Sequence, residues 1–407
     1  MIIIIVASAT AAVGGLLLAQ ERLAAPEAAS AAAIIWPEAT SERTVPEPPP
    51  RVERIVIAAV GDLMTHSPQF TSARTAEGYD FGPCFAPVAA RLSGADLAIG
   101  NFETVVAGAE RGFSGYPTFN APDEFAKAAA GAGFDVLTTA NNHVLDRGPS
   151  GLERTLEVLD DLDVKHTGSA RTKTEAASFV IADVKGVSVA VLAYTYGMNG
   201  FTAPVDRPWM VNVIDQARMR DAVKRAREAG AEIIIVSIHN GIEYQRHPSE
   251  SQVALERAMI DAGADVVLGS HPHVIQPMEM VEATAADGSA RTAFIIHSLG
   301  NFVSNQRERF RDTGLVLELI FEKNLRSRAT RLVGVEYTPV WVDDTDDSGR
   351  EHRILPIGEV LADSGYPGVT GSERRKMQQA WDDTTGHLGG VGPASDDIAS
   401  RVFFAGR

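Results

Sequence analysis

The sequence has few cysteines and few basic residues, and each shortage excludes a class of protein. Cys84 is the only cysteine among 407 residues, so the chain can form neither an intrachain disulfide nor a zinc site built on several thiolates. Lysine and arginine number 37 against 53 acidic residues, which gives a net charge of −16. This charge disfavours a general binder of nucleic acid or of anionic membranes, and we expect no nucleic-acid partner.

Charge is also missing from the N-terminal stretch, whose first charged residue is Glu21. The stretch is about long enough to span a bilayer and also resembles the core of a signal peptide, although no basic residue precedes it. A buried core helix is the alternative, but the Ala/Pro-rich residues 24–50 that follow are typical of a tether. We therefore expect an extracytoplasmic protein, membrane-anchored by this segment or secreted after its cleavage.

The composition divides the chain into four parts. Residues 1–22 are the hydrophobic anchor or signal segment, and residues 23–53 are an Ala/Pro-rich linker. Residues 54–345 alternate between apolar and polar stretches and are predicted to form one large domain. Residues 346–407 form a C-terminal extension that we expect to be partly irregular, especially over Trp381 to Ser395, which is rich in Asp, Gly and Thr.

The domain begins with a continuously apolar run, Ile55 to Val60, which is typical of a strand covered on both faces. A unit of helix, small-residue turn, apolar strand and polar loop then recurs four times, which predicts an α/β domain with mainly parallel pairing. The predicted strands are 95–99, 133–139, 230–238 and 263–268, and three of the predicted helices are 125–131, 216–229 and 251–262.

Further strands are expected outside these units. Residues 176–181 and 187–192, with Lys185-Gly186 between them, predict a hairpin. Residues 292–296, 314–320 and 330–337 mix polar and apolar residues as antiparallel strands do. A second sheet packed on the first is therefore expected, and the predicted fold is two packed mixed β-sheets flanked by helices.

Polar residues with metal-binding side chains follow the predicted strands. In α/β sheets, sites form beyond the carboxyl ends of the strands, so we expect these loops to meet at one rim. Carboxylate, amide and imidazole groups without cysteine suit two divalent ions, such as manganese, iron or zinc. The residues concerned are Asp62, Glu103, Asn142, His143, His239, His271 and His273.

The stretch from Gly269 to Gln276 contains the most suggestive of these patterns, His271-Pro-His273, directly after an apolar strand. Imidazole is the commonest metal ligand in proteins. On its own, the pattern fits two loop histidines near a turn equally well. Its position at the end of the fourth unit, among the other polar loops, favours a metal site.

Six short motifs occur in a fixed order over about residues 54–305. They are Gly61-Asp62, Gly100-Asn-Phe-Glu103, Asn141-Asn-His-Val-Leu-Asp146, His239-Asn-Gly-Ile-Glu-Tyr244, Gly269-Ser-His-Pro-His-Val-Ile-Gln276 and Ser298-Leu-Gly-Asn-Phe302. This series resembles that of the CapA family, the poly-gamma-glutamate capsule synthesis proteins. CapA proteins resemble calcineurin-like metallophosphoesterases, so the resemblance implies a four-layer sandwich with a dinuclear metal site.

The resemblance also implies a role for each matching residue. His143 would protonate a leaving group or stabilise developing charge. The metal ligands would be Asp62 and His273 for the first ion, Glu103 as the bridging carboxylate, and Asn142, His239 and His271 for the second ion.

Two departures from the phosphoesterase pattern weaken the expectation of hydrolysis but not that of metal binding. The pattern has a histidine two residues after the first aspartate, where this chain has Met64. His66 would either replace that histidine or be an ordinary loop residue. In the second motif Asn101 stands in place of an aspartate, and a bridge through Asn101 instead of Glu103 would be weaker.

Other polar residues near the motifs have two interpretations each. Asp146 would orient His143 through a hydrogen bond or cap the helix that follows. Glu243 and Tyr244 would contact substrate or only fix their loop, and Asn301 would add a polar group to the rim.

The remaining histidines and arginines have no evident chemical role. His297 is expected to be structural. Arg307, Arg309 and Arg311 form a basic run that is typical of a solvated loop or, beside an anionic polymer, of a contact surface. The histidines expected at the surface are His166, His247, His352 and His387.

Three functions are open on this sequence. The first is a CapA-like role in the biosynthesis or export of an anionic capsule polymer, in association with a membrane synthase. The second is a free-standing phosphoesterase that uses metal ions and acts on a phosphate-containing substrate. The third is a non-catalytic polymer-binding or scaffold subunit with a vestigial site, which Met64 and Asn101 favour.

Overall fold

The computed structural model describes residues 51–285, 288–343 and 352–388, together with the backbone of residues 402–403. The predicted N-terminal hydrophobic segment and nearly all of the predicted linker lie outside these residues. In the ranges that are described, no helix has the length and apolarity needed to cross a membrane.

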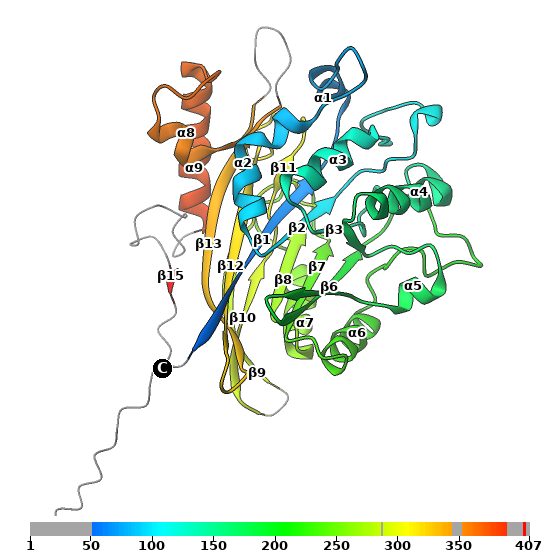
Figure 1. Ribbon diagram of the computed structural model, residues 1–407, viewed down its shortest axis with the longest axis vertical. Helices are drawn as coiled ribbons and strands as arrows, with labels where there is room; N and C mark the ends of the chain where they lie inside the picture. Colours follow the sequence, from blue (N-terminus) through cyan, green and yellow to red (C-terminus); the bar gives the residue numbers. More distant parts are fainter. Residues whose placement is uncertain (1–50, 286–287, 344–351, 389–401, 404–407) are drawn as a thin grey trace, which may run out of the picture. The chain divides into compact units, whose positions relative to one another are not determined.

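The first of two sheets is organised around β1, a long strand near its middle (Figure 1). Parallel neighbours β2, β3 and β4 follow on one side of β1, and antiparallel β12, β13 and β14 follow on the other. The short strand β11 pairs with β1, and β15 pairs with β13. The bounds are β1 Val52–Leu63, β2 Leu97–Phe102, β3 Val136–Thr138, β4 Lys165–Thr167, β11 Asn301–Val303, β12 Thr313–Asn324, β13 Thr330–Val342, β14 Ile354–Pro356 and β15 Val402–Phe403.

The second sheet has the strand order β5-β6-β7-β8-β10-β9. Its four central strands run parallel, and its two edge strands, β5 and β9, are antiparallel to their neighbours. The bounds are β5 Val180–Val184, β6 Val187–Thr195, β7 Ile233–His239, β8 Val266–Ser270, β9 Met278–Thr284 and β10 Ala290–Ile296.

Residues of β1 alternate between two cores, which explains why the strand is apolar from Ile55 to Val60. Ile55 and Ile57 lie in the core between the two sheets, whereas Ala58 and Val60 lie in the core beneath α2 and α3. A strand covered on both faces has no solvent side, so it shows no polar alternation. Burial on both faces was therefore readable from the sequence.

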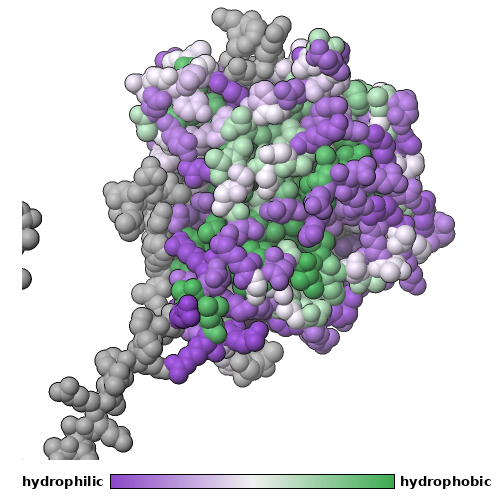
Figure 2. Space-filling model, viewed as in Figure 1, coloured by the Kyte–Doolittle hydropathy of each residue, from purple (hydrophilic) through white to green (hydrophobic). Residues whose placement is uncertain are grey.

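Helices cover the outer face of each sheet and complete four layers. On the first sheet these are α2 and α3, over which Figure 2 shows weakly hydrophobic residues. On the second sheet they are α6 and α7, which pack on β6, β7, β8 and β10. The helix bounds are α1 Ser67–Ser72, α2 Gly82–Gly94, α3 Asp123–Ala132, α4 Gly148–Asp161, α5 Lys173–Ala177, α6 Gln216–Glu228, α7 Glu250–Ala262, α8 Ile357–Ala362 and α9 Gly371–Leu388, with a 3₁₀ turn at Ala109–Arg111.

The predicted fold class, two packed mixed sheets flanked by helices, is confirmed, and so are the three predicted helices α3, α6 and α7. Local chemistry sets the ends of α6 and α7. The side chains of Asp215 and Ser249 accept hydrogen bonds from first-turn amides, and Gly263 ends α7 in a left-handed conformation.

The repeated units divide between the two sheets, which the sequence did not indicate. Strands β2 and β3 belong to the first sheet, and β7 and β8 belong to the second. The antiparallel strands β12 and β13 were correctly predicted but join β1 in the first sheet. The hairpin is β5 with β6, and its first strand begins at Val180, because residues 173–177 form α5 instead.

The expectation of an irregular chain from Trp381 is wrong up to Leu388, because α9 includes these residues. Met377 and Ala380, one turn apart, pack with Trp341 of β13 in a separate apolar core. This packing stabilises a helix that its Asp, Gly and Thr content disfavours. Residues 389–395 lie outside the described residues. The predicted boundary between the domain and the C-terminal extension, near residue 346, stays a prediction.

The expectation of surface histidines is wrong for His352, which is 6% exposed. Its Nε2 lies 3.1 Å from the Asn305 side-chain oxygen, and its Nδ1 lies 2.5 Å from the Ser72 hydroxyl. His166 is also shielded, because its side chain is 7% exposed and its Nε2 lies 3.1 Å from Asp160. The partners of His352 are far from it in the sequence, whereas Asp160, in α4, is only six residues before His166.

We expect the burial of His352 to make the protein sensitive to acid. Burial lowers the pKa of His352 from 6.5 to about 3, so the unfolded state binds more protons between these values. This residue then reduces the free energy of unfolding by about 1.4 kcal/mol for each pH unit below 6.5. Denaturant unfolding at pH 7 and pH 5 should show a smaller loss for His352→Gln than for the wild type. The exposed His247→Gln serves as control, and equal losses in all three proteins would contradict the expectation.

Candidate metal centre

The predicted ligand residues meet where strands of both sheets end. Asp62 lies near the end of β1, and Glu103 directly follows β2. His239 is the last residue of β7, and His271 directly follows β8. The rule that sites form beyond the carboxyl ends of parallel strands therefore holds across two sheets at once.

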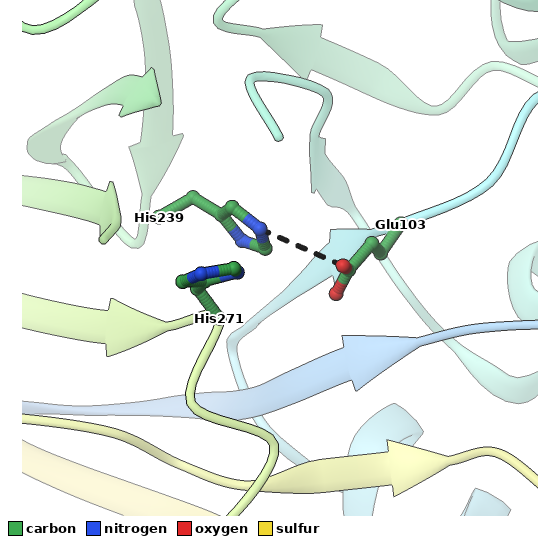
Figure 3. Close-up of side chains that lie close together, drawn as sticks. All are labelled: Glu103, His239 and His271. Carbon is green, nitrogen blue, oxygen red and sulfur yellow. Dashed lines mark ion pairs between the residues drawn. The ribbon is translucent and has the colours of Figure 1, made fainter. Parts of the chain in front are cut away.

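Two groups of buried side chains have the spacing needed to hold a metal ion, and both include Glu103. The first group is Asp62, Glu103 and His273, and the second is Glu103, His239 and His271. Ligand atoms within each group lie within 4.8 Å of one another. Figure 3 shows the second group, in which His239 Nε2 is 3.5 Å from Glu103 Oε1. The grouping places His273 with Asp62 and His271 with His239, as the resemblance implied.

Glu103 has the most unusual environment in the site. The residue is 0% exposed, and neither carboxylate oxygen has a hydrogen-bond partner. Burial, followed by repulsion from Asp62, raises the pKa of Glu103 well above its ordinary value. A buried carboxyl group without partners is costly, so its presence points to a ligand.

The turn that presents His271 and His273 is strained. The backbone angle φ is 99° at His271 and 59° at His273, a region that side-chain-bearing residues rarely adopt. Gly269 precedes the turn, where a Cβ atom would lie 1.9 Å from the carbonyl oxygen of His297. Strain of this kind concentrates at functional sites, because the surrounding fold must hold it.

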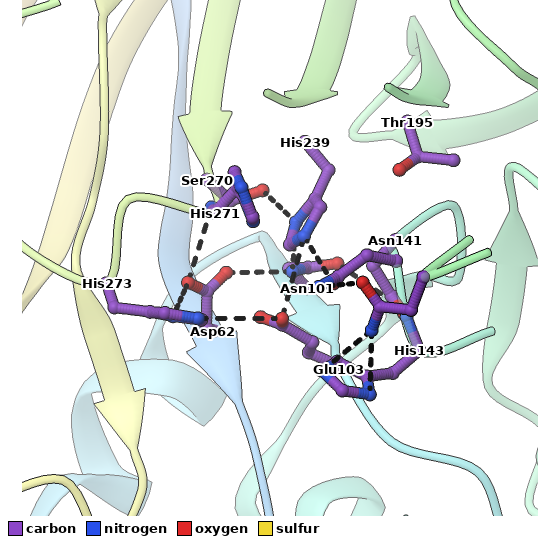
Figure 4. Close-up of polar contacts among 12 residues, drawn as sticks. Asp62, Asn101, Glu103, Asn141, His143, Thr195, His239, Ser270, His271 and His273 are labelled. Atoms are coloured by element: carbon purple, nitrogen blue, oxygen red, sulfur yellow. Dashed lines mark hydrogen bonds and ion pairs between the residues drawn. The ribbon is translucent and has the colours of Figure 1, made fainter. Parts of the chain in front are cut away.

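Asn101 contacts a ligand side chain of each metal-binding group. Its side-chain nitrogen donates to Asp62 Oδ1 at 2.8 Å and lies 3.1 Å from His239 Nδ1 (Figure 4). Its oxygen accepts from the Thr138 hydroxyl at 3.3 Å. Asn101 therefore holds two ligand side chains in place, while Glu103 belongs to both metal-binding groups.

Asn142 and Ser270 contact opposite nitrogens of the His239 ring. The Asn142 side-chain oxygen is 2.9 Å from Nε2, and the Ser270 hydroxyl is 3.0 Å from Nδ1. Asn142 thus presents an oxygen beside the second group. His271 Nδ1 is buried and has no hydrogen-bond partner, so its electron pair can bind a metal ion.

Burial keeps the second group's imidazoles neutral. It lowers the pKa of His239 well below the ordinary value and that of His271 to about 4. Repulsion between neighbouring histidines acts in the same direction. A neutral imidazole has a free electron pair, which is the form that binds metal.

Asp146 contacts His143, and it does not cap the following helix. His143 Nδ1 is 2.8 Å from Asp146 Oδ2, which also accepts from the Phe119 amide at 2.6 Å. The residue before α4 is Arg147, which makes no side-chain cap. Of the two interpretations of Asp146, the structure supports the one in which it orients His143.

His66 and Met64 lie apart from both metal-binding groups. Met64 is 1% exposed and belongs to the buried interior. His66 Nδ1 accepts a hydrogen bond from the Asn305 amide at 3.2 Å, and burial lowers the pKa of His66 to about 4. His66 therefore does not replace the missing histidine as a member of either group.

Glu243, in the loop after β7, and Asn301, the first residue of β11, border the first group. Glu243 is exposed and forms a third potential metal-binding group with His271 and His273. Asn301 is 0% exposed, and its side-chain oxygen is 3.1 Å from His273 Nδ1. Its nitrogen donates to the Arg311 carbonyl at 2.7 Å, so Asn301 ties the first group to a neighbouring loop.

Two residues at the site were missed by the sequence analysis, Tyr196 and Asn199. The Tyr196 ring lies 4.6 Å from that of His271, and the Asn199 amide lies 3.4 Å from His143 Nε2. Both follow β6, another parallel strand of the second sheet. The strand-end rule would have found them, had β6 not been taken only as half of a hairpin.

Comparison with known proteins places these residues in a family. Residues 56–306 match the model of the family described as bacterial capsule synthesis protein PGA_cap. The capsule biosynthesis protein CapA of Bacillus anthracis is 30% identical over 321 residues, which are 74% of this chain and 73% of that protein. The PGA biosynthesis protein CapA of Bacillus subtilis is 32% identical over 252 residues, 60% of this chain and 61% of that protein.

Among solved structures, the NAD nucleotidase of Haemophilus influenzae is similar with a TM-score of 0.43 and 13% sequence identity. The similar region covers 86% of this chain and 59% of that chain. The fold assignment rests on the sheet order and helix layers described above.

Proposed function

Because the chain belongs to the bacterial capsule synthesis protein family PGA_cap, we propose that it is an extracytoplasmic, CapA-like protein in the biosynthesis or export of an anionic capsule polymer. The polymer is of the poly-gamma-glutamate type, and the protein carries a dinuclear metal site. It is anchored or secreted through its N-terminal segment and works with a membrane synthase.

The observation that carries the proposal is Glu103, which is shared by two metal-binding groups and has two buried oxygens without hydrogen-bond partners. A carboxylate in this position fits a bridge between two ions. The set fits divalent ions such as manganese, iron or zinc. The first ion would be held by Asp62, Glu103 and His273, and the second by Glu103, Asn142, His239 and His271.

Two divalent ions there would supply Lewis acidity and neutralise charge on the oxygens of an anionic substrate. The chain itself contributes a proton donor beside them. Asp146 accepts a hydrogen bond from His143 Nδ1, which holds the ring in place. The Nε2 atom is then left to exchange a proton with the substrate. Asn199, 3.4 Å from Nε2, would help to keep the ring pointed at the site.

A free-standing phosphoesterase is the second candidate, and the His143–Asp146 pair is the observation that favours it. A scaffold with a vestigial site has no need for an oriented proton donor.

The test measures metal content and turnover on the purified full chain. We expect about two divalent ions per chain, and near-absence of manganese, iron and zinc would overturn the proposal. His143→Ala should keep its metal, because His143 belongs to neither metal-binding group.

Turnover of a generic phosphodiester separates the two candidates. Activity in the wild type that falls by about 100-fold or more in His143→Ala favours the phosphoesterase. Metal without such turnover favours the polymer role. In a strain lacking the gene, polymer release should then be restored by the wild type and not by His143→Ala.

A further inference from the structure

A cavity of about 150 Å³ lies between the loop after β11, the loop after β7 and helix α9. Helix α9 lies beside β13 in Figure 1. Ile275 lines the cavity two residues after His273, so the two sites share one segment of chain. We call this cavity the arginine pocket, defined by Arg246, Arg307, Arg309, Phe310, Lys376 and Asp383.

The pocket is positively charged in a chain of net charge −16. Its lining has four cationic side chains and only two acidic ones, Asp312 and Asp383. Asp312 already accepts hydrogen bonds from Trp341 Nε1 and the Thr313 hydroxyl. Basic residues are the minority in this protein, so their concentration beside the metal centre favours an anionic ligand.

Two arginine guanidinium groups lie against the ring of Phe310. The Arg246 guanidinium is 4.2 Å from the ring centre, and that of Arg309 is 4.8 Å from it. Phe310 has a φ of 77°, a costly conformation for a bulky residue. Stacking on an aromatic ring leaves the edge of a guanidinium, where its N–H donors lie, open to a carboxylate.

The cations of the pocket are incompletely neutralised. Arg309 forms two hydrogen bonds with Asp383, at 2.6 and 2.8 Å. Arg246 donates only to the backbone oxygen of Asp383, and burial lowers the pKa of its guanidinium. Within the residues described, neither Arg246 nor Lys376 forms an ion pair with a carboxylate.

A chain of contacts joins the pocket to the metal centre. The Asn301 side chain contacts His273 at 3.1 Å and the Arg311 carbonyl at 2.7 Å. The Arg311 guanidinium lies 3.4 Å from the centre of the Tyr244 ring, which lies 6.1 Å from that of His273. Arg311 lies between the pocket residues Phe310 and Asp312 in the sequence, so these contacts connect His273 with the segment that lines the pocket.

We propose that the arginine pocket is a subsite for carboxylate groups of an anionic polymer, a segment of which lies at the metal centre. Arginine binds carboxylates through two parallel hydrogen bonds, and repeated carboxylates can occupy the pocket and the metal centre together. The inference rests on the proposed function, because it assumes a polymeric anionic substrate. Phosphate shares this binding chemistry and is separated from carboxylate by the test.

The experiment is calorimetric titration of the purified full chain with a synthetic ten-residue oligomer of γ-linked glutamate, and separately with inorganic phosphate. The double variant Arg246→Gln/Arg309→Gln should bind the oligomer at least about tenfold more weakly, because hydrogen bonds between charged groups contribute that much. Lys376→Gln, a single exposed change, should weaken binding by about threefold and guards against misfolding of the double variant. Arg218→Gln, whose side chain is 88% exposed on α6, should bind like the wild type.

Selective weakening in the pocket variants supports the inference. Equal oligomer binding in the wild type and both pocket variants would overturn it, as would no binding by the wild type. Phosphate that binds the pocket as tightly as the oligomer would overturn the assignment to carboxylates. The proposed function fails on metal content and polymer release, whereas this inference fails on oligomer affinity, so the two failures are distinguishable.

Discussion

Replacing Glu103 with glutamine is expected to remove most of the bound metal and yet leave the metal-free protein at least as stable as the wild type. Glu103 belongs to both metal-binding groups, so its loss affects both ions. We expect a fall of about 100-fold or more in metal affinity, since even residues that only orient a ligand contribute about 10- to 100-fold. Metal analysis after dialysis against graded chelator measures this.

The stability change has the opposite sign because of how Glu103 is buried. Its oxygens have no hydrogen-bond partners, and Asp62 repels it. Glutamine has the same shape and carries no charge, so chelator-treated Glu103→Gln should gain about 1–3 kcal/mol in free energy of unfolding. A clear loss of stability in chelator would show that Glu103 is a structural residue.

Glu256→Gln is the matched control. Glu256 is equally buried, at 1% exposed, but His297 Nδ1 lies 2.5 Å from its carboxylate, and Gln252 donates to it at 3.2 Å. This variant should lose stability and keep its metal. The contact also confirms the prediction that His297 is structural.

Gly61→Ala is expected to lower the free energy of unfolding by about 3 kcal/mol or more. A Cβ at Gly61 would lie 1.9 Å from the carbonyl oxygen of Gly300. That oxygen accepts the Asp62 amide at 3.0 Å, so the clash is with backbone and no rotamer change relieves it. Overpacking of this kind exceeds the usual cost of about 1–3 kcal/mol.

Denaturant unfolding measures the effect, and Gly94→Ala is the control. A Cβ at Gly94, the last residue of α2, would meet no atom within 4 Å. That variant should stay within about 0.5 kcal/mol of the wild type. If Gly61→Ala left the free energy of unfolding as unchanged as Gly94→Ala, β1 would not lie as close to the loop before β11 as described. The folded fraction of Gly61→Ala should also bind metal poorly, because Asp62 would shift with the strand.

Much of the fold followed from local patterns. Ile55 to Val60 is apolar at every position, because Ile55, Ile57 and Ala59 meet one core while Ala58 and Val60 meet the other. Alternating helices and strands, with caps such as Ser249 and a left-handed Gly263, are visible in a few consecutive residues. These patterns are short-range, so the sequence reveals them without the fold.

Packing between distant segments was not readable in this way. The helix α9 continues from Trp381 to Leu388, although these residues are rich in Asp, Gly and Thr, and it packs Met377 and Ala380 against Trp341. His352 is buried by Ser72 and Asn305, which are far from it along the chain. Hydrophobic periodicity in the sequence does not reveal contacts between such distant residues.

The candidate site shows the same division. The sequence alone determined which chemistry is present, because metal-binding side chains follow the apolar strands and strand ends converge. Only the tertiary structure decided that Glu103 is shared by both groups and that Asn101 contacts both Asp62 and His239. It also decided that Asp146 holds His143 and that an arginine pocket lies beside His273. The reason is distance along the chain: Asp62 meets the His271 amide across 209 residues, a contact that depends on how two sheets pack.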